Sequence, residues 1–271
     1  MATHPMTAVA GLVALAASTA AAQDTIYLAT SGSTLYRAVQ AEAAETFSLS
    51  DDITSLLRAP NGDILGISPS ENGSGTFEIY RLLGALSSNP TLELVSDSLP
   101  NSYPGATYVG DTLYGFRNGS RNLVTYDIGS GVETEVGPAA PMQGPVGGAA
   151  YDRNTDTFYA VSRTDASLFS IDYRAGSGDP DATLIGSLGI GIFNMGLDYY
   201  EGSGSLYAAF EDTTNGQFVA GTVSTDTGLF MGDTILFDGA LDGSVGFIVV
   251  PAPGVLAAFA AGGLVATRRR R

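Results

Sequence analysis

The sequence predicts an all-β domain of the β-propeller type, with five blades favoured and six as the alternative. The first observation is a repeat that reads Gly-apolar-x-Tyr, a polar turn, an apolar strand with a central aromatic residue, a polar loop and a further strand. The three clearest copies begin at Gly105, Gly148 and Gly196. Their central aromatic residues are Tyr114, Tyr159 and Tyr207, which lie 45 and 48 residues apart. Repeats of this length, made of short strands and Gly, Asn and Asp turns, are typical of propeller blades.

The second observation is that partial copies lie at both ends of the repeated region. A weaker copy occupies residues 56–84, where Leu65 replaces the aromatic residue, and residues 26–39 look like the later half of one more copy. Residues 243–250 (GSVGFIVV) read as a lone apolar strand. This strand could complete the first blade, which would close the ring and hide two sheet edges. An open β-sandwich or a solenoid is the alternative architecture.

The third observation is that no segment of the body, residues 23–249, has a convincing long helical period. Short hairpins fit better: Tyr151 to Thr157 and Tyr199 to Ser205 each predict a tight turn between two strands. We therefore expect helices only outside the body, in residues 1–22 and in residues 250–271.

The N-terminal segment, residues 1–22, has the pattern of a secretory signal peptide. An apolar run at residues 8–17 leads to small residues, and Ala20 and Ala22 fit a cleavage site before Gln23. The charged amino-terminal part of such a signal is weak here, since His4 stands without Lys or Arg. We expect export through the Sec machinery.

The C-terminal segment, residues 250–271, combines two prolines, an uncharged apolar run and a basic end. The prolines oppose a helix before Gly254, and residues 254–267 carry no charge. As a helix this run would be roughly 21 Å long, shorter than a hydrocarbon core of roughly 30 Å. Such a length suits a temporary membrane anchor, with the arginines on the cytoplasmic side. The basic end consists of Arg268, Arg269, Arg270 and Arg271.

This arrangement resembles the PEP-CTERM family of bacterial sorting signals. Val250, Pro251, Ala252 and Pro253 form a VPAP variant of the motif, in which Ala252 replaces the usual Glu. The resemblance implies processing by an exosortase, a membrane transpeptidase. It also implies an inner-membrane intermediate, a final place at the cell surface or outside the cell, and extracellular polysaccharide as the usual setting. It covers only residues 250–271.

Composition excludes several kinds of chemistry. After removal of residues 1–22 the chain has no His, Cys, Trp or Lys, so catalytic triads, His or Cys metal sites, Schiff bases and disulfides are excluded. Without the four terminal arginines, the body has eight basic and 28 acidic residues, a net charge of −20. Such a body should be repelled by nucleic acid. The remaining options are a cation site, with Ca²⁺ as the candidate cofactor, or carboxylate catalysis.

The body also resembles, loosely, extracellular propellers whose blades carry a G-x-x-Y-D…G-x-L-Y-A pattern. That resemblance implies a fold and no particular activity. The matching residues are Gly148, Tyr151, Asp152, Tyr159 and Ala160 in one repeat, and Gly196, Tyr199, Leu206, Tyr207 and Ala208 in the next.

The candidate ligand-binding residues lie in the polar loops that follow the second strand of each repeat. Equivalent loops gather on one face of a propeller, so they could combine charges from different blades. These candidates are Arg117, Arg163, Asp165, Glu211 and Asp212. A partial calcium-loop pattern, Asp152-x-Asn154-x-Asp156, lacks the later Gly and acidic residues and fits a hairpin turn better.

These observations favour an exported, non-enzymatic surface or matrix protein that acts as a binding module. Two alternatives remain open at the sequence level. One is a glycan hydrolase or lyase that uses a pair of carboxylates on the propeller axis. The other is a calcium-dependent surface binder.

Overall fold

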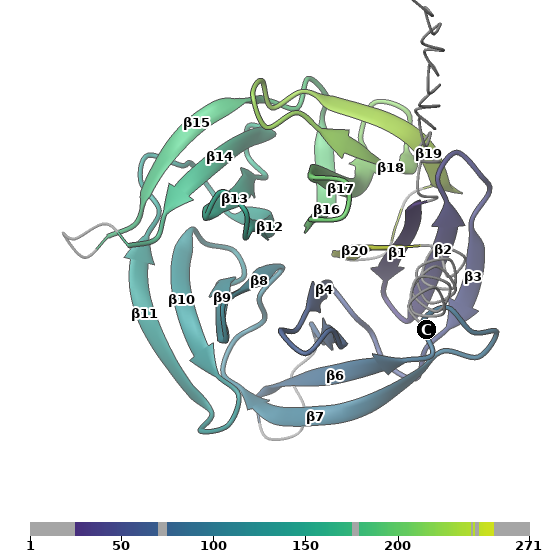
Figure 1. Ribbon diagram of the computed structural model, residues 1–271, viewed down its shortest axis with the longest axis horizontal. Helices are drawn as coiled ribbons and strands as arrows, with labels where there is room; N and C mark the ends of the chain where they lie inside the picture. Colours follow the sequence, from purple (N-terminus) through teal and green to yellow (C-terminus); the bar gives the residue numbers. More distant parts are fainter. Residues whose placement is uncertain (1–24, 70–74, 175–178, 240, 242–243, 252–271) are drawn as a thin grey trace, which may run out of the picture.

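The computed structural model describes residues 25–69, 75–174, 179–239, 241 and 244–251. In this part of the chain, twenty strands form five four-stranded sheets that stand round one axis as the blades of a propeller (Figure 1). The prediction of an all-β propeller with five blades is confirmed; six blades, an open sandwich and a solenoid are wrong. The expected signal peptide and the apolar segment with its arginines lie outside the described residues. Within those residues, no helix is long and apolar enough to cross a membrane.

Each blade is an antiparallel sheet whose first strand lies next to the axis. Blade 1 contains β20 (Val245–Pro251), β1 (Thr25–Ser31), β2 (Thr34–Val39) and β3 (Glu45–Ser48). Blade 2 contains β4 (Ser55–Arg58), β5 (Ile64–Ile67), β6 (Phe77–Leu83) and β7 (Thr91–Leu99). Blade 3 contains β8 (Gly105–Val109), β9 (Thr112–Phe116), β10 (Asn122–Asp127) and β11 (Val132–Pro138). Blade 4 contains β12 (Val146–Asp152), β13 (Thr157–Ser162), β14 (Ser167–Asp172) and β15 (Asp181–Ser187). Blade 5 contains β16 (Ile192–Tyr200), β17 (Ser205–Asp212), β18 (Gln217–Val223) and β19 (Phe230–Asp238).

Blade 1 is assembled from both ends of the described chain, as the sequence predicts. β20 pairs antiparallel with β1 along its whole length, from Ser31 opposite Val245 to Thr25 opposite Pro251. In Figure 1 the yellow β20 lies beside the purple β1 at the centre of the ring. The last strand therefore closes the ring and removes the open edge of the first one.

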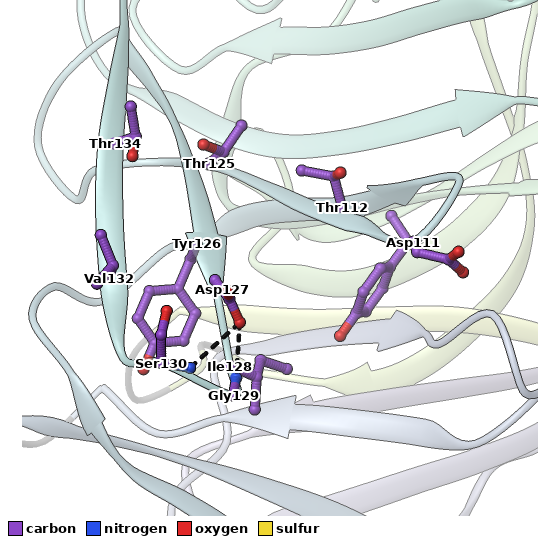
Figure 2. Close-up of a pocket in the computed structure, with 11 residues that line it drawn as sticks. Asp111, Thr112, Thr125, Tyr126, Asp127, Ile128, Gly129, Ser130, Val132 and Thr134 are labelled. Atoms are coloured by element: carbon purple, nitrogen blue, oxygen red, sulfur yellow. Dashed lines mark hydrogen bonds between the residues drawn. The ribbon is translucent and has the colours of Figure 1, made fainter.

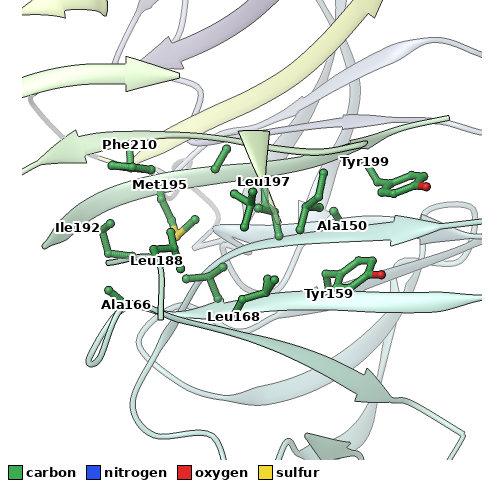
Figure 3. Close-up of a cluster of buried hydrophobic side chains, with 14 residues drawn as sticks. Ala150, Tyr159, Ala166, Leu168, Leu188, Ile192, Met195, Leu197, Tyr199 and Phe210 are labelled. Atoms are coloured by element: carbon green, nitrogen blue, oxygen red, sulfur yellow. The ribbon is translucent and has the colours of Figure 1, made fainter. Parts of the chain in front are cut away.

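The blades are held together by five clusters of buried apolar side chains, one at each boundary between neighbouring blades. Figure 3 shows the cluster between blades 4 and 5, in which Leu168 and Leu197 meet and the rings of Tyr159 and Tyr199 stack at 6.4 Å. β1 is buried along its whole length, since alternate side chains enter the clusters on its two sides. Outer strands such as β7 and β11 are mostly exposed.

The Gly that opens each repeat allows the five inner strands to approach one another. A Cβ atom added at Gly148 would lie 3.2 Å from the Gly196 carbonyl carbon, and one at Gly196 would lie 2.7 Å from the Phe247 backbone nitrogen. Gly246 continues the series, because its added Cβ would lie 2.9 Å from the carbonyl carbon of Ser55. These backbone contacts narrow the axis. We call the face where the inner strands begin the upper face, and the face where they end the lower face.

Candidate functional site

A small cavity lies on the axis below the glycines. Its volume is about 20 Å³, and the tyrosines that end the first strand of each complete repeat, Tyr108, Tyr151 and Tyr199, all line it. Blade 2 places Arg58 at the equivalent position. A cavity of this size has room for about one water molecule. The axis therefore offers a polar chamber and not a channel.

Two side chains in this chamber hold the closing strand. Asp198 of β16 accepts a hydrogen bond from the Val249 N–H at 2.8 Å, and Arg58 of β4 donates one to the Val249 carbonyl oxygen at 2.5 Å. Val249 belongs to β20, and these groups face away from its partner strand β1. Blades 5 and 2 thus clamp the inner edge of the strand that lies between them.

The Asp198 carboxyl has an unusual protonation equilibrium. Burial among the inner strands raises the pKa of Asp198 to about 7, although the charge of Arg58 and the Val249 hydrogen bond act in the opposite direction. The residue as a whole keeps partial exposure to the chamber. Near neutral pH, Asp198 can hold or release a proton, which is the property required of a general acid.

A second carboxylate, Glu201, also lines the chamber, and its Oε1 lies 3.6 Å from the Nε of Arg153. Two carboxylates, those of Asp198 and Glu201, therefore line the same chamber, and a carboxylate-based glycosidase needs such a pair at a defined separation. A sugar ring, however, is much larger than a cavity of about 20 Å³.

A hollow with a volume of about 610 Å³ lies on the lower face of blade 3. Figure 2 shows Thr112, Thr125 and Thr134, from β9, β10 and β11, around one side of it. The opposite side is formed by Asp111 and by the hairpin of residues 127–132. Hydroxyl and carboxylate groups therefore dominate its wall.

The hairpin on this wall has a fixed shape. Asp127 Oδ1 accepts hydrogen bonds from the backbone N–H groups of Gly129 at 2.8 Å and Ser130 at 3.2 Å, drawn as dashed lines in Figure 2. Hydrogen bonds from Ser130 and Gly129 hold the pKa of Asp127 below its ordinary value. Burial raises the pKa of Tyr108, on the same wall, to about 12, so its hydroxyl remains protonated. These groups are ordered before any ligand arrives.

The hollow continues towards blade 2. A second depression of about 320 Å³ shares Tyr108, Asp111 and Ile128 with the first and adds Asn61 and Asp63 from the hairpin between β4 and β5. We call the two together the blade 2–3 groove. It can accept an extended ligand that is longer than either part.

The structure places Arg117, one of the candidates from the sequence, in a network at the boundary between blades 2 and 3. Its guanidinium donates to Glu133 at 2.6 Å and to Glu135 at 2.7 Å. Tyr103 and Asn101 donate to the same Glu133 carboxylate. The donors of Arg117 are thus engaged with acidic side chains of its own blade.

Arg163 and Glu211 both lie beside Phe193 on the upper face. The Arg163 guanidinium carbon is 5.2 Å from the centre of the Phe193 ring, and Glu211 is the cross-strand partner of Phe193. Asp212 accepts the backbone N–H of Thr214 at 2.8 Å and closes its turn, while Asp165 is exposed at a loop tip. The structure thus places both residues next to the same phenylalanine. Ligand binding by these residues remains a prediction.

The partial calcium pattern forms the hairpin between β12 and β13. Asp152 accepts the backbone N–H of Asn154 at 2.8 Å and the hydroxyl of Thr155 at 2.6 Å. Asp156 is bound by Tyr151, Tyr173 and Arg174. In the described residues, no three His, Cys, Asp or Glu side chains come together as metal ligands would.

Sequence reasoning missed Asp198, Arg58 and the groove. Asp198 precedes the repeat tyrosine Tyr199, at a position where the other repeats have Thr107 and Ala150, so an acid within an inner strand was a detectable signal. The groove had no such signal, because threonines and aspartates in β-hairpins are ordinary turn and surface residues.

Comparison with known proteins supports the fold and goes no further. The sequence matches no protein-family model and no curated protein sequence. A chain of a nidogen–laminin complex is similar in structure, with a TM-score of 0.51 and 10% identity, and the match covers 82% of this chain and 98% of that one. An auxiliary nutrient-binding protein from Bacteroides ovatus has a TM-score of 0.43 and 11% identity, with 78% and 64% covered. A luciferin-regenerating enzyme has a TM-score of 0.46 and 12% identity, with 85% and 73% covered. At such identities the first likeness shows a shared propeller fold only, and the other two are too weak to add to it.

Proposed function

We propose that this protein is an exported propeller that is sorted at the membrane by residues 250–271 and then acts as a non-enzymatic binding module at the cell surface or outside the cell. The sorting part rests on the VPAP motif, the uncharged run and the terminal arginines. An exosortase-type transpeptidase and the Sec machinery are the partners that this pattern implies.

The observation that carries the binding part is the contrast between the axis and the lower face. The axial chamber has room for about one water molecule, whereas the blade 2–3 groove is open and includes a hollow of about 610 Å³. Ligand sites are concave and large enough to enclose much of their ligand. The groove meets this requirement and the chamber does not.

The proposed ligand is a segment of extracellular polysaccharide. The threonine and serine hydroxyls and the aspartate carboxylates of the groove can exchange hydrogen bonds with sugar hydroxyls, and Tyr108 adds an aromatic group. The hollow of blade 3 is lined by no basic side chain. On the blade 2 side Arg81 lines the groove, but its guanidinium is paired with Asp63 and with Glu93, each at 2.8 Å, and the body is strongly acidic. These features favour an uncharged polymer over an acidic one.

Binding is tested with the protein purified from the extracellular fraction of its host and with the polysaccharide of the same culture. Thr134→Arg introduces a long cationic side chain into the hollow. Thr164→Arg is the matched control, because Thr164 is exposed on the upper face. We expect the first variant to lose binding in affinity electrophoresis and the second to retain it. Equal binding by both variants, or no binding by the unmodified protein, would contradict the proposal.

Sorting is tested by the intact mass of the protein in membrane and extracellular fractions. We expect an extracellular chain that begins near Gln23 and ends between Pro251 and Gly254, with or without an added group. An extracellular or surface-attached chain that still carries Arg268 to Arg271 would contradict exosortase processing.

A further inference from the structure

Both ends of the described chain leave the propeller at one point of its lower face. Thr25, the first residue of β1, lies directly opposite Pro251, the last residue of β20. β20 is the inner strand of blade 1, so this point lies beside the axis and not at the rim (Figure 1). The chain continues from Pro251 into the uncharged run after only Ala252 and Pro253.

The connection between the strand and this run is short. From Pro251 to Gly254 the chain advances three residues, which span at most about 11 Å when fully extended. A four-stranded blade reaches about 14 Å from its inner to its outer strand at the usual strand spacing. The connection is thus shorter than a blade is wide, and it begins near the middle of the ring.

The connection cannot lengthen easily by peeling β20 away from the sheet. Val249 and Val250 are buried, at 0% and 5% exposure, and the main chain of Val249 is held by Asp198 and Arg58 in addition to its pairing with β1. Peeling would expose these side chains and leave the Asp198 carboxyl without its backbone donor.

The blade 2–3 groove opens on this same lower face. Its wall is built from the hairpins that follow β4, β8 and β10, which lie at the end of the ring where Pro251 also emerges. The loops that follow β13 and β17, with Thr164 and Thr213, lie at the opposite end.

We propose that, while residues 254–267 are held in a membrane, the propeller lies with its lower face against that membrane. This inference rests on the membrane part of the proposed function. The partner surface is the lipid bilayer itself, and the short connection beside the axis sets the orientation.

The test uses the full chain from Gln23 to Arg271, reconstituted into preformed vesicles of phosphatidylcholine, a lipid without net charge. Single cysteine variants are labelled from outside with a large polyethylene glycol maleimide. The chain has no cysteine of its own, so each introduced thiol is unique. Ser130→Cys and Asn154→Cys report on the lower face, and Thr164→Cys and Thr213→Cys are matched controls on the upper face; all four residues are exposed. Flotation of the vesicles measures membrane attachment separately.

We expect the chain to float with the vesicles, with labelling lost at the two lower positions and retained at the two upper ones. In the same variants ending at Pro253, all four positions should be labelled equally. If the chain floats and the lower positions are labelled as fast as the upper ones, the orientation is wrong while the membrane segment stands. If the chain does not float, the membrane part of the proposed function fails, and this inference fails with it.

Discussion

Gly196 and Asp198 lie two residues apart on β16, and both face β20 of blade 1, yet the space beside the two residues differs. At Gly196 the neighbouring backbone is so close that no side chain fits. At Asp198 the strands leave a chamber of about 20 Å³, which charged and aromatic side chains line. The inner strands are therefore in close backbone contact in the upper part of the ring, whereas in the lower part they enclose a small polar centre that binds the closing strand.

The largest effect is expected when one methyl group is added at the close backbone contact of Gly196. In Gly196→Ala, the new Cβ would meet the backbone nitrogen of Phe247 at 2.7 Å. Overpacking of a core that cannot yield costs about 3 kcal/mol, which corresponds to a fall in Tm of about 10 °C. Thermal unfolding followed by circular dichroism measures it. Gly129→Ala, in an exposed hairpin, is the control and should change Tm little. An equal fall in Tm in both variants would mean that the backbone contact at Gly196 does not limit the size of the residue there.

Removal of the Asp198 charge is expected to stabilise the protein, whereas the added methyl group at Gly196 is expected to destabilise it. Because the pKa of Asp198 is raised from 3.8 to about 7 in the folded protein, its ionisation makes folding less favourable as pH rises from about 4 to about 7, and the penalty is complete above that range. Asp198→Asn removes the penalty and keeps an acceptor for Val249. We expect the variant to gain about 2 kcal/mol over the unmodified protein at pH 8, with no gain at pH 3. Urea unfolding at both pH values measures this, and a difference that does not change with pH would contradict it.

Glu133 is also a partly buried carboxylate, but its pKa is lowered, whereas the pKa of Asp198 is raised. Burial acts to raise its pKa, but hydrogen bonds from Tyr103, Arg117 and Asn101 hold it below the ordinary value. Its stabilising effect is therefore present above the unfolded pKa and is lost as pH falls through the folded one. Glu133→Gln should lower the free energy of unfolding by about 1.5 kcal/mol at pH 7. A loss that is as large at pH 2 as at pH 7 would contradict this account.

The smallest effect is expected at Arg163, where the only described contact of the guanidinium is the Phe193 ring. Arg163→Gln should lower the free energy of unfolding by about 0.5 kcal/mol, the lower end of the range for a cation–π pair. Denaturant midpoints measured in parallel with Glu133→Gln compare the two sites. A loss at Arg163 as large as that at Glu133 would mean that it has a structural role like that of Arg117.

The sequence predicted the ring because the features that build it recur. Gly148 and Gly196, Tyr151 and Tyr199, and Tyr159 and Tyr207 stand at equivalent positions, since each blade faces the same packing problem. The lone strand at residues 243–250 was placed correctly because an unpaired first blade needed a fourth strand.

The candidate site could not be predicted in the same way, because it depends on contacts that occur once. Arg117 is a charged residue in a polar loop, which made it a candidate for ligand binding, but its partners Glu133 and Glu135 lie on another strand of the same blade. The clamp on Val249 joins Asp198 of blade 5 and Arg58 of blade 2, which flank blade 1 only after the ring has closed. No local sequence pattern indicates such contacts between distant residues.

The closing strand also fixes the order of events during synthesis. Within the propeller, β1 is made first and β20 last, and pairing between such distant segments is slow. Until residues 245–251 have been made, blade 1 lacks its inner strand and β1 keeps an open edge. The ring can therefore close only when the last strand of the propeller is available.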